Sequence, residues 1–186
     1  AETFGENKII CIDGKTVSIA LGLIIMETVQ AMQDGCALKE VIRRTELAIK
    51  NTYIYVPLPT LDYLLKGGRV TKQKHFVAKM LNLKPIITFN REGYVKPAGK
   101  AIGYKSAMKK TLKLVAEKAK SFRKVKFMVA HTDAVEQAEW LVAQLKQRLN
   151  VEDIPIVEAA PVLGVHAGPG AAAVAFLGYN EKGDIQ

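Results

Sequence analysis

The run from Val17 to Met32 is apolar on nearly every side of a helix. A helix with that pattern has to be buried, so we expect a core helix that ends at Gly35. The longest purely apolar stretch, Ile19 to Met26, is far shorter than the about 20 residues that span a bilayer. Because no charged and then apolar leader precedes it, we expect a soluble, cytoplasmic protein whose core contains this helix.

Strand and helix patterns alternate around this run. The expected elements are a strand at Lys8–Ile12, an amphipathic helix at Leu38–Lys50 and a strand at Tyr53–Val56. Their order is typical of an α/β layer. Pro57 and Pro59 then interrupt the pattern, which places a domain boundary there. We therefore expect residues 1–57 to belong to a first α/β layer and residues 58–186 to be a second domain.

The second part contains more strands than helices. The expected helices are Leu61–Lys66, Phe76–Leu81, Ser106–Lys120 and Ala134–Leu149. The expected strands are Lys84–Phe89, Gly93–Ala98, Val125–His131, Ile154–Glu158, Pro161–Val165 and Ala171–Leu177. This order predicts a mainly antiparallel sheet of five or six strands with helices packed on one face.

Charge and residue usage exclude several function classes. The net charge of +9 comes largely from lysines, many of them between Lys100 and Lys126 on a helix with an apolar stripe. Only Tyr104 and Phe122 interleave with these lysines, which argues against nucleic-acid binding and favours solubility or docking of an acidic partner. The two cysteines and three histidines lack metal-ligand spacing, so we expect no metal, disulfide or cofactor site.

The segment from Pro161 to Gly170 carries the first candidate for ligand chemistry. It places His166 between an apolar run and a turn formed by Gly168, Pro169 and Gly170. A histidine at that position can donate a hydrogen bond to a carboxylate or phosphate, and a glycine turn can present N–H groups to an anion. The alternative is a core histidine before an ordinary turn.

A second candidate follows the short helix that Thr60 can cap. Gly67 and Gly68 end this helix and lead directly into Arg69. The guanidinium of Arg69 is placed to bind an anion or an acidic partner. We expect Arg69 beside His166 in a cleft.

Taken in order, these segments resemble the DegV family of bacterial fatty-acid-binding proteins. The resemblance rests on Ile12-Asp13, the helix ending at Gly35, Leu61–Val70, Leu81–Ile86 and Gly164–Gly170. It covers nearly all of the chain but lacks the leading segment of the family. The implied fold is an α/β, two-domain DegV-like fold in which residues 1–57 are only a remnant of the first α/β domain.

The resemblance also implies a function. A DegV-like carrier holds a long-chain fatty acid in an apolar tunnel of the second domain, with the carboxylate at the domain junction. It presents the acid to a separate kinase subunit that makes an acyl phosphate for phospholipid synthesis, and it is not itself an enzyme. The family's carboxylate-binding histidine corresponds to His166, and its Gly-Gly-Arg motif corresponds to Gly67, Gly68 and Arg69.

Burial of the acyl tail supplies affinity at about 0.8 kcal/mol per CH₂, so a few polar groups suffice at the carboxylate. The side chains that could line a tunnel are Phe76, Met80, Leu81, Leu83, Ile86, Ile87 and Phe89. Each of them could equally be ordinary core.

Two other functions stay open on the sequence. The chain could be a structural or interaction domain that has lost its ligand site, because the leading segment supplies part of the family's carboxylate site. It could also be an enzyme acting on a phosphorylated small molecule, with the glycine turn holding the phosphate and His166 as general acid.

Overall fold

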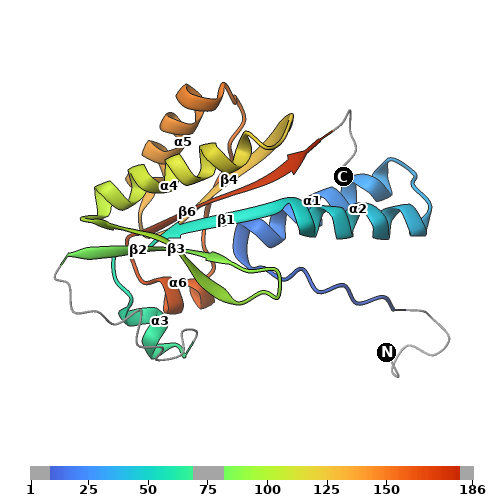
Figure 1. Ribbon diagram of the computed structural model, residues 1–186. Coiled ribbons are helices and arrows are strands. Elements are labelled where there is room, and N and C mark those ends of the chain that lie inside the picture. Colours follow the sequence, from blue (N-terminus) through green and yellow to red (C-terminus); the bar gives the residue numbers. More distant parts are fainter. Residues whose placement is uncertain (1–8, 69–81, 181–186) are drawn as a thin grey trace.

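The computed structural model describes residues 9–68 and 82–180, which build one mixed sheet covered by helices (Figure 1). The sheet has the strand order β3-β2-β1-β6-β4-β5. Its strands are β1 (Thr52–Pro57), β2 (Leu83–Phe89), β3 (Val95–Ile102), β4 (Lys124–Thr132), β5 (Ile156–Glu158) and β6 (Ala171–Tyr179). Only the β4–β5 pair is parallel among these described strands, so the expected, mainly antiparallel sheet is confirmed.

Strand β1 lies in the middle of this sheet. It pairs with β2 through Val56 and Pro57, and with β6 from Thr52 to Tyr55. The sheet therefore starts before Pro57, whereas the sequence patterns had placed all of it after Pro59. The division into domains 1–57 and 58–186 stays a prediction, with β1 belonging to the same sheet as the later strands.

Helices cover both faces of the sheet, which corrects the expectation of a single covered face. The helices are α1 (Ser18–Gln33), α2 (Leu38–Asn51), α3 (Asp62–Lys66), α4 (Tyr104–Ala119), α5 (Val135–Leu149) and α6 (Pro161–Ala167). Helix α1 packs through Ile19 and Leu23 on one face, while α4 and α5 pack through Leu112 and Leu141 on the other. The reason lies in β6, whose side chains are buried on both sides.

Helix α1 is buried on one side only, so the expectation of a fully buried helix is wrong. Ile25, Met26, Val29 and Met32 are all more than 40% exposed. An outer-layer helix packs one stripe on the sheet and one flank on α2, which leaves its remaining stripe exposed whatever its residues are. Among the described residues, none of the helices is both long enough and apolar enough to cross a membrane.

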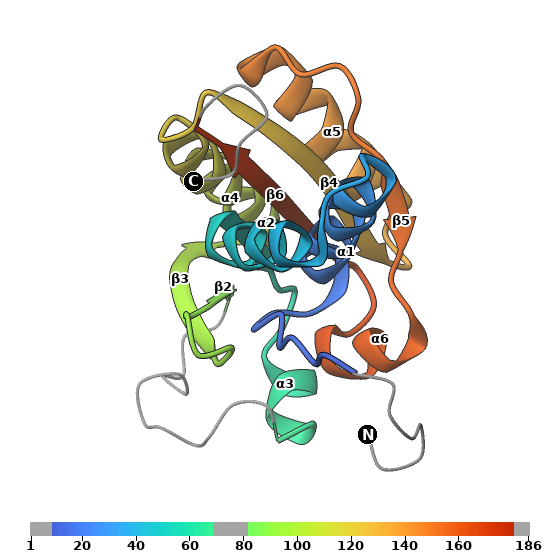
Figure 2. The same cartoon turned by 90° about the vertical axis from the view of Figure 1, so that its right-hand side faces the viewer.

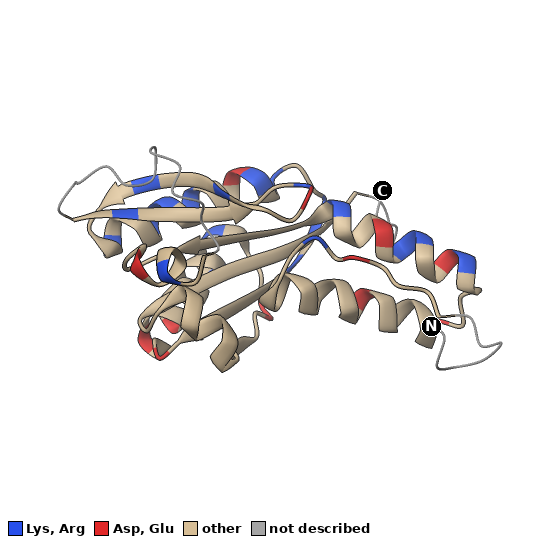
Figure 3. Cartoon of the chain, turned by 90° about the horizontal axis from the view of Figure 1, so that it is seen from below, with Lys and Arg blue, Asp and Glu red and all other residues tan. Residues whose placement is uncertain are grey.

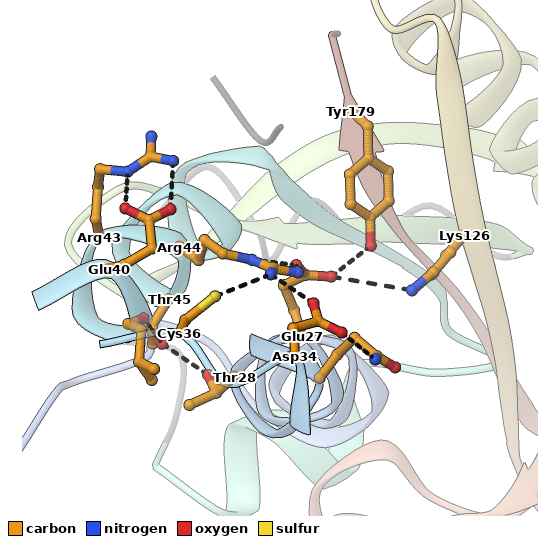
Figure 4. A network of polar contacts seen from close by, with 12 residues as sticks. Glu27, Thr28, Asp34, Cys36, Glu40, Arg43, Arg44, Thr45, Lys126 and Tyr179 are labelled. Atoms are coloured by element: carbon orange, nitrogen blue, oxygen red, sulfur yellow. Dashed lines mark hydrogen bonds and ion pairs between the residues drawn. The ribbon is translucent and has the colours of Figure 1, made fainter. Parts of the chain in front are cut away.

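A buried ion pair joins α1 to α2. Glu27 is only 2% exposed, and its Oε1 accepts hydrogen bonds from Nε and Nη2 of Arg44 at 3.1 and 2.5 Å (Figure 4). Its Oε2 accepts a hydrogen bond from the Tyr179 hydroxyl at 2.8 Å, and Arg44 Nη1 donates to Asp34 at 2.8 Å. These contacts raise the pKa of Arg44 further above its ordinary value, and burial raises that of Tyr179. The network fixes the helix pair to the end of β6.

Two short segments differ from the expected elements. Residues 9–12 form no strand. The run from Pro161 to Val165 forms the helix α6 instead of a strand. Proline suits the first turn of a helix because it needs no N–H partner there, and Gly168 with φ 78° ends the helix.

Candidate functional site

An apolar cavity of about 360 Å³ lies on the α1 face of the sheet. Its walls come from β1, β2, β3, β4, β6, α3, α6 and the start of α1. Most of its lining is aliphatic or aromatic, and the polar side chains among the described lining residues are Ser18, His131, Thr132 and His166. A cavity of this size and composition is typical of sites for apolar ligands.

Small side chains on β4 and β6 make room for this cavity. Ala130 and Ala173 are direct cross-strand partners on the cavity floor, and Ala171 pairs with Thr132 next to them. Larger residues occupy the equivalent positions farther along the same face, where Met128 and Leu177 contact α1. The space is therefore produced by the sequence of these two strands, at one end of the sheet.

His166 lines this cavity from α6, not from the strand that the sequence had suggested. Its Nδ1 is buried and has no hydrogen-bond partner among the described residues. A buried polar atom without a partner is costly, so a partner from a ligand would be favourable at this position. His131, by contrast, accepts a hydrogen bond from the Ala134 N–H at 3.4 Å at the start of α5.

Gly67 lies directly against the His166 ring. A Cβ placed on Gly67 would lie 2.2 Å from His166 Nδ1, so only glycine allows the end of α3 to come this close. The two short helices are neighbours below the sheet in Figure 2. Gly68 follows with φ 66° and ends α3. The structure thus brings together His166 and the Gly67–Gly68 turn.

The turn after His166 is held by Thr132. The Thr132 hydroxyl donates to the Gly168 carbonyl, and its backbone carbonyl accepts from the Gly170 N–H at 2.7 Å. Gly168 also needs to be glycine, because a Cβ there would lie 2.4 Å from the Tyr63 ring. Pro169 is exposed between them. The turn therefore fixes α6 and α3 relative to β4.

Tyr104 supports the cavity floor from the other side of the sheet. Its hydroxyl accepts a hydrogen bond from the Ala172 N–H at 3.0 Å, and burial raises its pKa to about 12. The phenol therefore stays protonated at neutral pH and can also donate to the Pro57 carbonyl at 3.5 Å. This contact ties α4 to β6 between the cavity residues Ala171 and Ala173.

Ser18 is a site residue that the sequence reasoning missed. It lines the cavity as the first residue of α1 and has φ 60°, a conformation that is rare outside glycine. Such outliers cluster at ligand sites. The available signal was a serine at the start of a long helix, a position where its hydroxyl and the free N–H groups can meet an anion.

The predicted tail-lining residues divide into three groups. Ile87 and Phe89 line the cavity, whereas Leu83 and Ile86 are not among its lining residues. Ile86 is fully buried on the opposite side of β2, close to Gly99 and the Lys110 side chain. Phe76, Met80 and Leu81 lie outside the described residues, as does Arg69.

Comparison with known proteins now decides the family. A sequence profile described as "Uncharacterised protein, DegV family" matches residues 1–178. The chain belongs to the DegV family.

Relatives with known sequences and structures agree with this assignment. A DegV domain-containing protein of Clostridium perfringens is 28% identical over 181 residues, which are 97% of this chain and 62% of the relative. A DegV family structure from Ruminococcus gnavus, described with vaccenic acid, has 30% identity and a TM-score of 0.85, covering 94% of this chain and 62% of that one. A Thermus thermophilus DegV family structure described for fatty acid binding has 25% identity and a TM-score of 0.85, with coverage of 95% and 62%. The chain thus spans about 62% of the length of these relatives.

Proposed function

We propose that this chain binds a long-chain fatty acid in the cavity on the α1 face, with the carboxylate at His166. The observation that carries the proposal is an apolar cavity lined by His166, whose buried Nδ1 has no hydrogen-bond partner among the described residues. This combination suits a ligand with a long apolar part and one polar end.

The cavity suits both the apolar tail and the carboxylate of such a ligand. Each buried CH₂ group contributes about 0.8 kcal/mol, so the aliphatic walls provide most of the affinity. At the polar end, His166 can donate a hydrogen bond to the carboxylate. Val17 and Ser18 bring the start of α1 to the same cavity, and no side-chain cap bond occupies its first N–H groups among the described residues. Helix N-termini of this kind favour anions.

The relatives support the same ligand class. The R. gnavus protein is described with vaccenic acid, and the T. thermophilus protein is described for fatty acid binding. Both superimpose on this chain over more than nine-tenths of its length. The shared fold therefore supports a fatty acid as the ligand proposed for this chain.

The wider role follows from the family resemblance. In this role the chain acts as a carrier and not as an enzyme, and needs no cofactor besides the bound acid. It presents the carboxylate to a kinase subunit that forms an acyl phosphate for phospholipid synthesis. Arg69, which follows the Gly67–Gly68 turn beside His166, is the residue we propose to contact the carboxylate or the kinase.

The proposal is tested by identifying the ligand and then blocking the cavity. Organic extraction of the purified chain followed by mass spectrometry is expected to release a long-chain fatty acid. Ala173→Leu fills the cavity floor and should weaken binding of a fluorescent fatty acid by at least about tenfold, since the extra atoms take the place of the tail. The control Ala143→Leu adds the same atoms on the exposed side of α5 and should leave binding unchanged.

Three results would contradict the proposal. Extraction of a phosphate ester would favour an enzyme acting on a phosphorylated molecule. A chain that neither carries nor binds a fatty acid would favour a structural or interaction domain. Equal binding by Ala173→Leu and the parent would place the ligand elsewhere.

A further inference from the structure

The positive charge of this protein is concentrated in one stretch. Residues 93–131 contain ten lysines and one arginine but a single carboxylate, Glu117. The net charge of this stretch therefore exceeds the +9 of the whole chain. In Figure 3, Lys and Arg recur on the β3 and α4 side of the molecule; α2 also carries Lys and Arg, but mixed with Glu, and α1 carries none.

Helix α4 arranges its lysines on its solvent side. Its buried positions include Ala107, Met108, Leu112 and Val115, all on the side that meets the sheet. The exposed positions hold Lys105, Lys109, Lys110 and Lys113, and Lys120 follows directly after the helix. These five residues are called the lysine face below.

Strand β3 extends the lysine face at the edge of the sheet. Lys96 and Lys100 are exposed on β3, and Lys110 Nζ donates to the Lys100 carbonyl at 3.2 Å. Ile102, at the end of β3 and three residues before Lys105, is 72% exposed. The face thus combines many cations with one large apolar side chain at its rim.

The residue types indicate what kind of anionic partner fits. Protein interfaces are enriched in arginine and depleted in lysine, whereas the lysine face consists of lysines alone. Lysine acts as a hydrated point charge on a flexible stem and does not form the paired hydrogen bonds with which arginine recognises single carboxylates or phosphates. Flexible point charges suit a diffuse layer of negative charge, such as anionic lipid headgroups, to which each lysine contributes about 1 kcal/mol.

We propose that the lysine face docks this protein on the surface of an anionic lipid bilayer, with Ile102 entering the headgroup layer. Docking of this kind is peripheral and needs no membrane-spanning helix. It is independent of the fatty-acid site, because α4 packs on the opposite face of the sheet from the cavity.

Vesicle flotation tests this proposal directly. The purified chain is expected to float with vesicles that contain phosphatidylglycerol, and not with vesicles of phosphatidylcholine alone. The binding should disappear in 1 M salt, where the Debye length falls to about 3 Å. The triple variant Lys109→Glu, Lys110→Glu and Lys113→Glu should bind the anionic vesicles at least about a hundredfold more weakly.

A matched variant separates the lysine face from net charge. Lys39→Glu, Lys146→Glu and Arg148→Glu change the net charge equally at exposed positions on α2 and α5. This variant should weaken vesicle binding much less than the variant of the lysine face, because its three positions lie outside that face. The neutral variant with glutamine at positions 109, 110 and 113 should lie between the parent and the charge-reversed variant. Circular dichroism checks folding, and fluorescent fatty-acid binding should be equal in all variants.

Several outcomes would overturn the inference. They are absence of flotation with anionic vesicles, equal losses in the two charge-reversed variants, and binding of polyglutamate or RNA in place of vesicles. Loss of vesicle binding with intact fatty-acid binding supports the lysine face, while failure of fatty-acid binding in the parent bears only on the proposed function.

Discussion

At the scale of single residues, the position of the His166 ring depends on the absence of a Cβ atom at Gly67. Gly67 has φ −74°, which any residue can adopt, so its backbone does not require glycine. The requirement comes from the His166 ring, which occupies the place of a Cβ. The same relation holds between Gly168 and the Tyr63 ring. These two glycines set the distance between α3 and α6 and hold His166 at the cavity.

Gly67→Ala therefore tests the position of the imidazole. The new Cβ forces the ring to turn away from α3, so fatty-acid affinity should fall by about tenfold, the value of one lost charge-assisted hydrogen bond. Stability in urea should change by less than about 1 kcal/mol because a single ring can rotate. The control Gly22→Ala meets no atom within 4 Å and should leave affinity unchanged. Equal fatty-acid affinity of Gly67→Ala and the parent would show that Gly67 does not position His166 for ligand binding.

At the scale of elements, α1 and α2 form a unit that is tied to the sheet by Glu27. This role of Glu27 could not be predicted from the sequence, because a single carboxylate in the apolar run from Val17 to Met32 is expected to face solvent. In the structure Glu27 is buried between Arg44 and Tyr179. The helix pair, whose first residue Ser18 lines the cavity, thus depends on a charged contact as well as on apolar packing.

Glu27→Ala should destabilise the protein by about 3 kcal/mol, because it leaves Arg44, whose side chain is only 14% exposed, with Asp34 as its one remaining carboxylate partner among the described residues. Equilibrium unfolding in urea measures this change. The control Glu40→Ala removes an exposed partner of Arg43 on the same helix pair and should shift the unfolding midpoint far less. Equal shifts for the two variants would show that the Glu27 network contributes no more than a surface ion pair.

The type of an element could be predicted where a hydrophobic pattern extends over many residues. The helices α2, α4 and α5 were confirmed because each repeats an apolar stripe over several turns, and α1 was confirmed because its apolar run is too long for a strand. The run from Pro161 to Val165 is too short to show a period, so helix and strand could not be separated there. Ile86 and Ile87 are equally apolar, and only the pairing of β2 shows that they face opposite sides.

At the scale of the whole molecule, the sheet separates two surfaces with different chemistry. The α1 face holds the apolar cavity and His166, whereas the α4 face presents the lysine face. The order of the motifs predicted the family from the sequence. Local patterns could not predict the cavity, because it arises where alanines from β4 and β6 meet across the sheet. A serine at the start of a long helix was a local signal for Ser18, but only the placement of α1 shows that this residue reaches the site.

The central claim is that His166 holds the carboxylate of a bound fatty acid. The most direct measurement compares the affinities of the parent and His166→Ala for a long-chain fatty acid and for its methyl ester. The account predicts that the parent prefers the acid by at least about tenfold, and that His166→Ala loses this preference while its affinity for the ester stays unchanged. An equal preference for the acid in both proteins would contradict the claim.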